Sequence, residues 1–390
     1  FVPIFKRFLD VIFNENANIE QIDKVFYDLW SFFQTYDYKL TLNSRPVWEC
    51  YREKIIEITE DNFEFSLEDL NIGLAWLYRF LIPISIDVPK ADISHITLSG
   101  FPLMPALVLK YKYNTPLIIT EHGVFIRERL IAINSSEYSF FLKTLLIKFS
   151  ESVTRLAYYK ADLILSVNKF NNIWEKIYGA SPEKIKVIYN GVDHHLFVPG
   201  PKPDHLKDIP TVVAAARIFE LKDIITMIES CDIVRKTIPN VKYLVYGNKT
   251  DVPEYTAKCE ELIEKLHLQD NFILAGQHNQ PQKIFHQGDI SILTSISEGF
   301  PYTVIESMST GTPVVATDVG GVSEALDEKS GRLCKPKDAE NIAAGVIELL
   351  SNDKLREAMG KYAREQVIKR FTIDNFIKGY EAAYASLCEN

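Results

Sequence analysis

The sequence predicts an α/β protein built from two Rossmann-like domains that face each other across a cleft. Three observations predict this fold class. The chain has 390 residues, which is too long for a single compact core. From about residue 91, short apolar stretches alternate with helical stretches, a pattern typical of parallel sheets. The proline- and charge-rich segment Val198–Pro210 interrupts this alternation once, and the segment is typical of an interdomain linker.

The first part of the chain is assigned to an N-terminal domain over residues 1–197. Its first 90 residues are expected to be helical, because apolar side chains recur at helical spacing from Ile22 to Phe33 and from Leu74 to Leu81. The elements expected after them are a strand at Leu117–Thr120, a long helix at Tyr138–Lys160, a strand at Asp162–Val167, a helix at Lys169–Tyr178 and a strand at Ile185–Ile188.

The second series is assigned to a C-terminal domain over residues 198–372. Five strands are expected, at Thr211–Ala216, Val241–Tyr246, Phe272–Ala275, Asp289–Thr294 and Pro313–Thr317. Helices are expected between and after them, at Lys222–Lys236, Tyr255–Leu266, Pro281–Gln287, Thr303–Ser309, Ala339–Leu350 and Asp353–Arg370. A terminal helix within residues 373–390 is predicted to cross back to the first domain. Ligands of such a protein are expected at the carboxyl ends of the strands.

Composition and spacing exclude several classes of function. A net charge of -9 with no basic run argues against a nucleic-acid partner. No apolar stretch reaches the length of about 20 residues that a membrane span needs. The eight histidines show no metal-ligand spacing, and the five cysteines form no C-x-x-C pair, which indicates reduced thiols and a cytoplasmic location. Neither half contains G-x-G-x-x-G, which argues weakly against a dinucleotide redox enzyme.

The strongest chemical signal is a pair of glutamates with seven residues between them, Glu298 and Glu306. Glu298 falls on the loop after an apolar strand, and Glu306 falls near the first turn of the next helix. Gly299 and Pro301 shape a tight turn, so backbone N–H groups at the helix start can face a ligand. The carboxylates suit paired hydroxyl groups, because each offers several acceptor sites. An arbitrary pair with this spacing would simply be two solvated glutamates.

The surrounding residues make the pair specific. The run E-G-F-P…V-I-E-S-M…G-T-P-V-V-A-T…G-G resembles the E-x7-E signature of the retaining family 4 glycosyltransferases, which have the GT-B fold. The resemblance implies that Glu298 binds sugar hydroxyls and that Glu306 binds a ribose. It also implies that the residues around them line the donor site: Gly299, Phe300, Pro301, Tyr302 and Thr303.

A second element consists of Arg217 and Lys222 at a strand-to-helix junction. A diphosphate could meet both cations and the helix N-terminus there. An isolated pair of this kind is usually a solvated face, but the family similarly carries an Arg and a Lys five apart that bind the donor diphosphate. Such cations stabilise the charge that grows on the leaving phosphate. Gly247, after another strand, is expected either to approach the donor or to form a plain strand-end turn.

A third element is Thr120-Glu121-His122-Gly123, followed by Arg127-Glu128-Arg129. An isolated His after a strand is more often a structural residue than a catalytic one. This stretch, however, resembles T-E-H-G…R-E-R in the branch that holds the Pel-polysaccharide glycosyltransferase PelF. The resemblance covers nearly the whole chain and implies that His122 contacts the reacting sugar. It further implies an acceptor side at Gly100, Arg127 and Arg129.

The sequence departs from this branch at its beginning. Members of the branch open with a strand and a Gly-rich loop, whereas the first two glycines here are Gly73 and Gly100. The first part of the usual N-terminal domain is therefore expected to be absent.

The resemblance implies a metal-independent hexosyltransferase that uses a UDP-sugar, with UDP-glucose as the usual donor, and that builds an exopolysaccharide. A glycan acceptor and association with a membrane-bound polysaccharide synthesis complex are the expected partners. Three alternatives stay open. The first is a sugar-nucleotide-binding subunit without turnover, the second is a GT-B-fold UDP-sugar 2-epimerase, and the third is a synthase acting on glycogen or sucrose.

Overall fold

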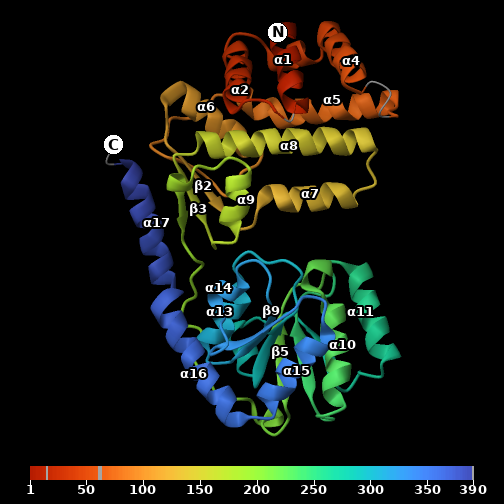
Figure 1. Ribbon diagram of the computed structural model, residues 1–390, viewed down its shortest axis with the longest axis vertical. Helices are drawn as coiled ribbons and strands as arrows, with labels where there is room; N and C mark the ends of the chain where they lie inside the picture. The colour runs from red at the N-terminus through yellow and green to blue at the C-terminus, as the bar shows by residue number, and fades with distance from the viewer. Residues whose placement is uncertain (15, 60–63, 389–390) are drawn as a thin grey trace. The chain divides into compact units, whose positions relative to one another are not determined.

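The computed structural model describes residues 1–14, 16–59 and 64–388, and the chain divides into two compact units. The N-terminal unit comprises Phe1–Ser166, Asn171–Val187 and Ala382–Asn390. The C-terminal unit comprises Val167–Phe170 and Ile188–Glu381. Each unit contains its own parallel sheet, and each is described separately below (Figure 1).

The sheet of the N-terminal unit has four parallel strands in the order β1-β2-β3-β4. The strands are β1 Ser94–Ile96, β2 Leu117–Glu121, β3 Leu163–Ser166 and β4 Ile185–Val187. Every residue of β2 and β3 is buried, as expected for central strands covered on both faces. In the register of these two strands, Glu121 stands opposite Ser166 at the carboxyl end of the sheet.

Helices of the N-terminal unit form two layers over this sheet. Helix α8 packs on β2, and α1, α2 and α5 pack on α8 from the other side (Figure 1). Their shared core is rich in aromatic rings, such as Phe8 and Phe149, which meet edge to face. The helices are α1 Val2–Phe13, α2 Ile19–Phe33, α3 Tyr38–Leu42, α4 Arg45–Thr59, α5 Leu67–Leu81, α6 Leu103–Tyr113, α7 Phe125–Ser135, α8 Phe140–Lys160 and α9 Asn171–Ile177, with short 3-10 turns at Ile82–Ser85 and Pro182–Lys184.

The sheet of the C-terminal unit has six parallel strands in the order β10-β9-β8-β5-β6-β7. The strands are β5 Thr211–Ala215, β6 Lys242–Tyr246, β7 Phe272–Gly276, β8 Ile290–Leu293, β9 Val314–Thr317 and β10 Gly331–Cys334. Side chains alternate between two cores: Val212 and Ala214 pack on one face of the sheet, and Val213 packs on the other. Covering both faces in this way produces the doubly wound arrangement.

Helices α10, α11 and α15 contribute to the first of these cores, and α13 and α16 contribute to the second (Figure 1). The helices of this part of the chain are α10 Ile224–Arg235, α11 Pro253–Lys265, α12 Gln282–Phe285, α13 Tyr302–Ser309, α14 Val322–Ala325, α15 Ala339–Leu350, α16 Asp353–Arg370 and α17 Ile373–Cys388, with 3-10 turns at Asp204–Leu206 and Glu220–Lys222. The last residues of α17 belong to the N-terminal unit.

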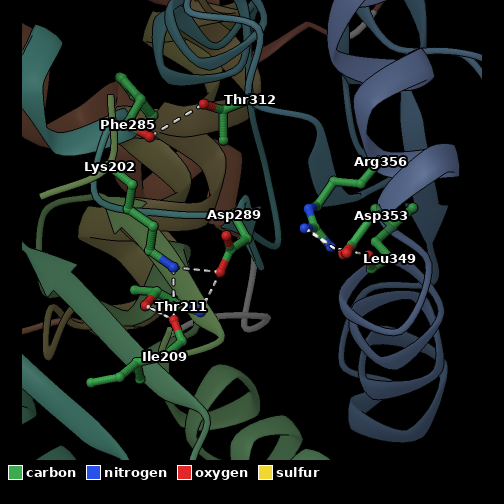
Figure 2. Close-up of polar contacts among 9 residues, drawn as sticks. All are labelled: Lys202, Ile209, Thr211, Phe285, Asp289, Thr312, Leu349, Asp353 and Arg356. Atoms are coloured by element: carbon green, nitrogen blue, oxygen red, sulfur yellow. Dashed lines mark hydrogen bonds and ion pairs between the residues drawn. The ribbon is translucent and has the colours of Figure 1, made fainter. Parts of the chain in front are cut away.

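A group of polar contacts among Lys202, Asp289 and Thr211, called the polar tie here, connects the amino ends of β5 and β8. Asp289 accepts a hydrogen bond from the backbone N–H of Thr211 at 2.8 Å and pairs with the Lys202 ammonium at 2.7 Å. Lys202 also donates to the carbonyl of Ile209 (Figure 2). The proline- and charge-rich segment 198–210 is therefore held against the base of the sheet, at the edge opposite to the strand ends that bind ligands in this type of fold.

The two parallel sheets confirm the predicted α/β class with two Rossmann-like domains. The expected strands and helices all occur, and two helices, α15 and α16, have the predicted bounds. Elements that were not predicted include β1, β10, α6, α7 and α14. In the described part of the chain, no helix combines the length and the apolar character needed to cross a membrane.

Candidate functional site

The strand order of the C-terminal unit identifies one topological switch point. From β5 the chain adds β6 and β7 on one side, and it then returns to add β8, β9 and β10 on the other side. The order reverses between β5 and β8, and open α/β sheets bind ligands at the carboxyl ends of the strands at such a point. Arg217 and Lys222 follow β5, and the run from Glu298 to Glu306 follows β8. The predicted donor residues therefore lie on both sides of the switch point.

Lys222 and Glu298 are in direct contact. The Lys222 ammonium lies 2.5 Å from Oε1 of Glu298, and the Ser295 hydroxyl donates to the same oxygen at 2.5 Å. The Glu298 side chain is only 10% exposed and that of Lys222 is 21% exposed, so water screens this ion pair poorly. Two backbone ties hold the two loops together: Thr294 Oγ1 donates to the Lys222 carbonyl, and the Ile296 N–H donates to the Leu221 carbonyl.

Arg217 occupies the same edge but points to another partner. Its Nε atom is 3.6 Å from Asp251, and its guanidinium lies over the Phe219 ring at 4.8 Å from the centroid. The side chain is 66% exposed, so little of it is fixed by packing. An exposed ion pair of this kind contributes on the order of 1 kcal/mol or less, and a ligand phosphate could compete with it.

The loop between the glutamates is closely packed. Phe300 is buried against the rings of Tyr189 and Phe371, and its carbonyl accepts a hydrogen bond from the Asn190 amide at 2.9 Å. Gly321 donates its N–H to the Gly299 carbonyl, and a Cβ at Gly320 would collide with the Glu298 carbonyl. Packing of Phe300 therefore holds this loop in place. Gly320 and Gly321 allow the loop after β9 to pack directly against it.

Helix α13 begins directly after this loop, and its first two turns carry uncapped backbone N–H groups and the carboxyl group of Glu306. Pro301 is its N-cap and provides no side-chain hydrogen bond, so the first backbone N–H groups, at Tyr302 and Thr303, have no intrahelical acceptor. Glu306 is the fifth residue of α13 and so lies just beyond the first turn, because the helix begins one residue earlier than expected from the sequence. Burial raises the pKa of the Glu306 carboxyl group to about 7. Among residues that the structure describes, none donates a hydrogen bond to that carboxyl group.

The start of α10, in contrast, is already capped. Asp223 adopts a left-handed conformation and its carboxylate accepts from the N–H and the hydroxyl of Thr226. Of these two helix starts, that of α13 is therefore the one open to an anion. At the neighbouring strand end, a Cβ at Gly247 would collide with the Ala216 carbonyl, so glycine is needed there to let the loops after β5 and β6 meet.

The remaining predicted residues lie in the N-terminal unit, beyond β1 and β2. His122 directly follows β2, and partial burial lowers the pKa of its imidazole. Gly100 is buried, and a Cβ there would lie 2.6 Å from the Phe125 ring. Arg127 and Arg129 lie in the first turns of α7; Arg129 is stacked over Phe101 at 5.9 Å, and its Nε atom is buried without a hydrogen-bond partner among the described residues.

The structure thus places Lys222 and Glu298 in contact. The predicted donor-binding residues lie in the C-terminal unit, whereas the predicted acceptor-side residues and His122 lie in the N-terminal unit. Ser295, Asp251 and Asn190 contact predicted site residues and were not singled out individually. Their short polar side chains at strand ends are ordinary loop residues in a sequence, so no pattern distinguishes them. Across the described ranges, no three acidic, His or Cys side chains group in a way that could hold a metal ion.

Comparison with known proteins agrees with this geometry. Residues 201–366 match the family model of Glycosyl transferases group 1. Residues 2–183 match a model for a domain of unknown function, DUF3492. The structure of Anabaena Alr3699/HepE in complex with UDP superposes with a TM-score of 0.65 at 18% identity, covering 76% of this chain and 79% of that one. The fold is GT-B.

Curated relatives match over part of the GT-B chain. It is 25% identical over 206 residues to N-acetyl-alpha-D-glucosaminyl L-malate synthase of Bacillus anthracis, covering 51% of this chain and 53% of the relative. The chain is also 30% identical over 178 residues to poly(ribitol-phosphate) alpha-N-acetylglucosaminyltransferase of Staphylococcus aureus. This match covers 45% of this chain and 35% of the relative. The chain therefore spans about half or less of the length of these relatives.

Proposed function

We propose that this chain transfers a hexose, with retention, from a UDP-sugar to a growing glycan. The observation that carries the proposal is the contact between Lys222 and Glu298 at the switch point of the C-terminal unit. It joins a cation suited to a diphosphate with an acid suited to sugar hydroxyls, from loops 76 residues apart in the chain. The match to Glycosyl transferases group 1 over the same residues supports it.

Each side chain then has a distinct role. Lys222, Arg217 and the first N–H groups of α13 bind the donor diphosphate, Glu298 binds hydroxyls of the sugar, and Glu306 accepts from the ribose diol. Gly247 and the loop Gly299–Thr303 complete the donor site. The partly buried, unpaired carboxyl group of Glu306 supports its role, because a carboxylate without a partner gains most from a ligand that donates to it.

The chemistry needs no nucleophile from the enzyme. The acceptor hydroxyl attacks the anomeric carbon on the face that the diphosphate leaves, the bond to the diphosphate breaks, and a phosphate oxygen of the departing UDP takes the hydroxyl proton. The negative charge that develops on the diphosphate is stabilised by Lys222 and Arg217, so the reaction is proposed to be metal-independent. His122 is assigned to the reacting sugar, and Gly100, Arg127 and Arg129 are assigned to the acceptor side.

The finer assignment follows the sequence resemblance to the PelF branch of family 4. UDP-glucose is the proposed donor and an exopolysaccharide the proposed product, made on the cytoplasmic face by association with a membrane-bound synthesis complex. UDP in the complex of the structurally similar HepE supports the choice of nucleotide.

Binding of sugar nucleotides tests the proposal directly. We expect UDP-glucose to raise the melting temperature more than ADP-glucose or GDP-mannose, since a ligand that binds the folded state stabilises it. Lys222→Ala should weaken UDP-glucose binding in calorimetry by about 10- to 100-fold, because a charge-assisted hydrogen bond contributes about 1.5–3 kcal/mol. Arg217→Ala should also weaken UDP-glucose binding.

Lys202→Ala is the matched control. Lys202 is also a partly buried, ion-paired lysine beside β5, but it lies at the amino end of that strand, at the opposite edge of the sheet (Figure 2). Its replacement should lower stability and leave the dissociation constant within about twofold. Equal UDP-glucose affinity in wild type and Lys222→Ala would overturn the donor site.

Binding without transfer or donor hydrolysis would favour a sugar-nucleotide-binding protein without turnover. Free epimer formed without acceptor would favour an epimerase.

A further inference from the structure

One fully buried carboxylate connects the loops at the ligand-binding edge of the N-terminal sheet. Glu121 is the last residue of β2 and is 0% exposed. Oε1 accepts from the backbone N–H of Ser99 and from the Tyr158 hydroxyl, both at 3.0 Å. Oε2 accepts from the N–H of Phe125 at 3.4 Å. The backbone carbonyl of Glu121 accepts from the Asn171 amide at 3.2 Å.

Tyr158 lies in α8, and the other three partners lie in or directly after the loops that follow β1, β2 and β3. Ser99 belongs to the loop after β1 and precedes Gly100 in sequence. Phe125 is the first residue of α7, directly after the loop that carries His122. Asn171 is the first residue of α9, after β3. One residue therefore joins the ends of β1, β2 and β3, and the first two of these loops carry predicted acceptor-side and catalytic residues.

The number and kind of donors suit a carboxylate. Two of the hydrogen bonds come from the backbone N–H groups of Ser99, in a loop, and of Phe125, in the first turn of α7, and neither of these N–H groups pairs in a sheet ladder. An amide at this position could accept on its oxygen, but its NH₂ group would then face an N–H donor. Burial without hydrogen bonds would cost several kcal/mol for such a group, so a buried carboxylate with several donors is a defined arrangement rather than a packing accident.

A second fully buried acid, Glu175 in α9, provides a comparison within the same unit. It is also 0% exposed, and it accepts from the hydroxyl of Ser166 on β3. Burial raises the pKa of Glu121 and of Glu175 to about 7 in each case, and the charge of Glu175 also raises the pKa of Glu121. Ser166 is a strand residue, whereas the Glu121 carboxyl group accepts from Ser99 in a loop and from Phe125 at the start of α7.

We propose that Glu121 is a positioning residue for glycosyl transfer: it holds the loops that carry Gly100 and His122 in the arrangement that the reaction requires. This inference rests on the function proposed above. It assigns no contact between Glu121 and substrate, because the side chain is fully buried.

Amide exchange tests the positioning without reference to activity. In the wild-type chain, peptides covering 97–102 and 122–126 should each retain a slowly exchanging amide, although loops usually exchange fast. Glu121→Gln should speed exchange in both peptides by about tenfold or more, and Glu175→Gln should leave them unchanged. Fast exchange of both loops in the wild type would overturn the inference even if Glu121→Gln failed to fold.

Kinetics then connect the loops to the reaction. Glu121→Gln should lower kcat on the order of 10- to 100-fold, since small misplacements of reacting groups have such effects. The dissociation constant for UDP-glucose should stay within about twofold, because the donor residues lie in the other unit. Tyr158→Phe, which removes one donor but keeps the carboxylate, should retain kcat within about threefold.

The outcomes separate the two hypotheses. If the wild type transfers no sugar, the proposed function fails and exchange still decides the role of Glu121. If the wild type transfers sugar while Glu121→Gln keeps both its kcat and its slow amides, the positioning role is wrong. An equal loss of kcat in Glu175→Gln would mean that burial of charge, and not the loop contacts, is what matters.

Discussion

Glu298 and Glu306 differ in environment although the sequence presents them as a matched pair. Glu298 accepts hydrogen bonds from Lys222 and Ser295, which keeps it in a charged network. Glu306 has no such donor in the described part of the chain, and burial raises the pKa of its carboxyl group to about 7. The charge of Glu306 is therefore sensitive to pH near neutrality.

This difference predicts a pH-dependent donor affinity. If ionised Glu306 accepts from the ribose diol, protonation removes acceptor capacity, so binding should weaken as pH falls through about 7. Between pH 8 and pH 6 the affinity for UDP-glucose should fall about tenfold, as expected for one proton with this pKa. UDP-glucose suits the calorimetric measurement because its diphosphate is a diester with no ionisation in this range.

Glu306→Gln provides the control, since it should bind weakly and show the same affinity at both pH values. Lys222→Ala should also bind weakly but keep the pH dependence. A wild-type affinity that does not change between pH 6 and pH 8 would show that Glu306 takes no part in binding as an anion.

The sequence could single out candidate residues in the C-terminal unit but could not show how they pair. The motif around Glu298 and the pair Arg217 and Lys222 were both identified from spacing and resemblance. That Lys222 contacts Glu298 depends on β5 and β8 being neighbours in the sheet, and that Arg217 pairs with Asp251 depends on β5 and β6 being neighbours. Neighbouring strands that are far apart in sequence leave no local signal, so this level of detail comes from the structure alone.

At the scale of elements, the sequence predicted every central strand but missed two of the four edge strands, β1 and β10. β2 and β5 contain the apolar runs Leu117–Ile119 and Val212–Ala215 because both of their faces are covered. β1 and β10 are edge strands of three and four residues that contain His95 and Arg332, so they show neither a long apolar run nor a clear period. Such strands form because a neighbouring strand is already in place, which is information that the local sequence lacks.

The tie at the amino edge of the C-terminal sheet should stabilise this unit independently of its ligand site. Asp289→Ala removes the partner of Lys202 and the acceptor for the Thr211 N–H at once (Figure 2). We expect the free energy of unfolding to fall by about 2–4 kcal/mol, because a largely buried ammonium loses its counter-charge. Denaturant titration would measure the loss, and the UDP-glucose affinity should not change.

The double variant Lys202→Met with Asp289→Ala separates charge from packing. It should regain part of the lost stability, because no unpaired charge remains buried. If Asp289→Ala alone lowers the free energy of unfolding by no more than about 0.5 kcal/mol, segment 198–210 is not held by this tie.

At the scale of the molecule, both units concentrate buried acids at the carboxyl ends of their strands. Glu121 and Glu175 lie at this edge of the N-terminal sheet, and Glu306 lies just beyond it in the C-terminal unit. Burial is the main cause of the raised pKa in all three, each to about 7. These edges thus carry a cost in stability near neutral pH, and perturbed pKa values of this kind are common at functional sites.

This arrangement fixes the sign of the pH dependence of stability. A carboxyl group whose pKa rises from 4.5 in the unfolded chain to about 7 in the folded one stabilises the fold fully at pH below 4.5. That stability is lost as pH rises through about 7. The free energy of unfolding should therefore be higher at pH 5.5 than at pH 7.5, and each such group accounts for on the order of 2 kcal/mol of the difference. Urea unfolding at the two pH values measures it. Glu175→Gln removes one titrating group, and it also removes a charge that raises the pKa of Glu121, so it should reduce the difference by at least that amount. An unchanged difference in Glu175→Gln, or greater stability of the wild type at pH 7.5, would show that the buried acids do not govern this response.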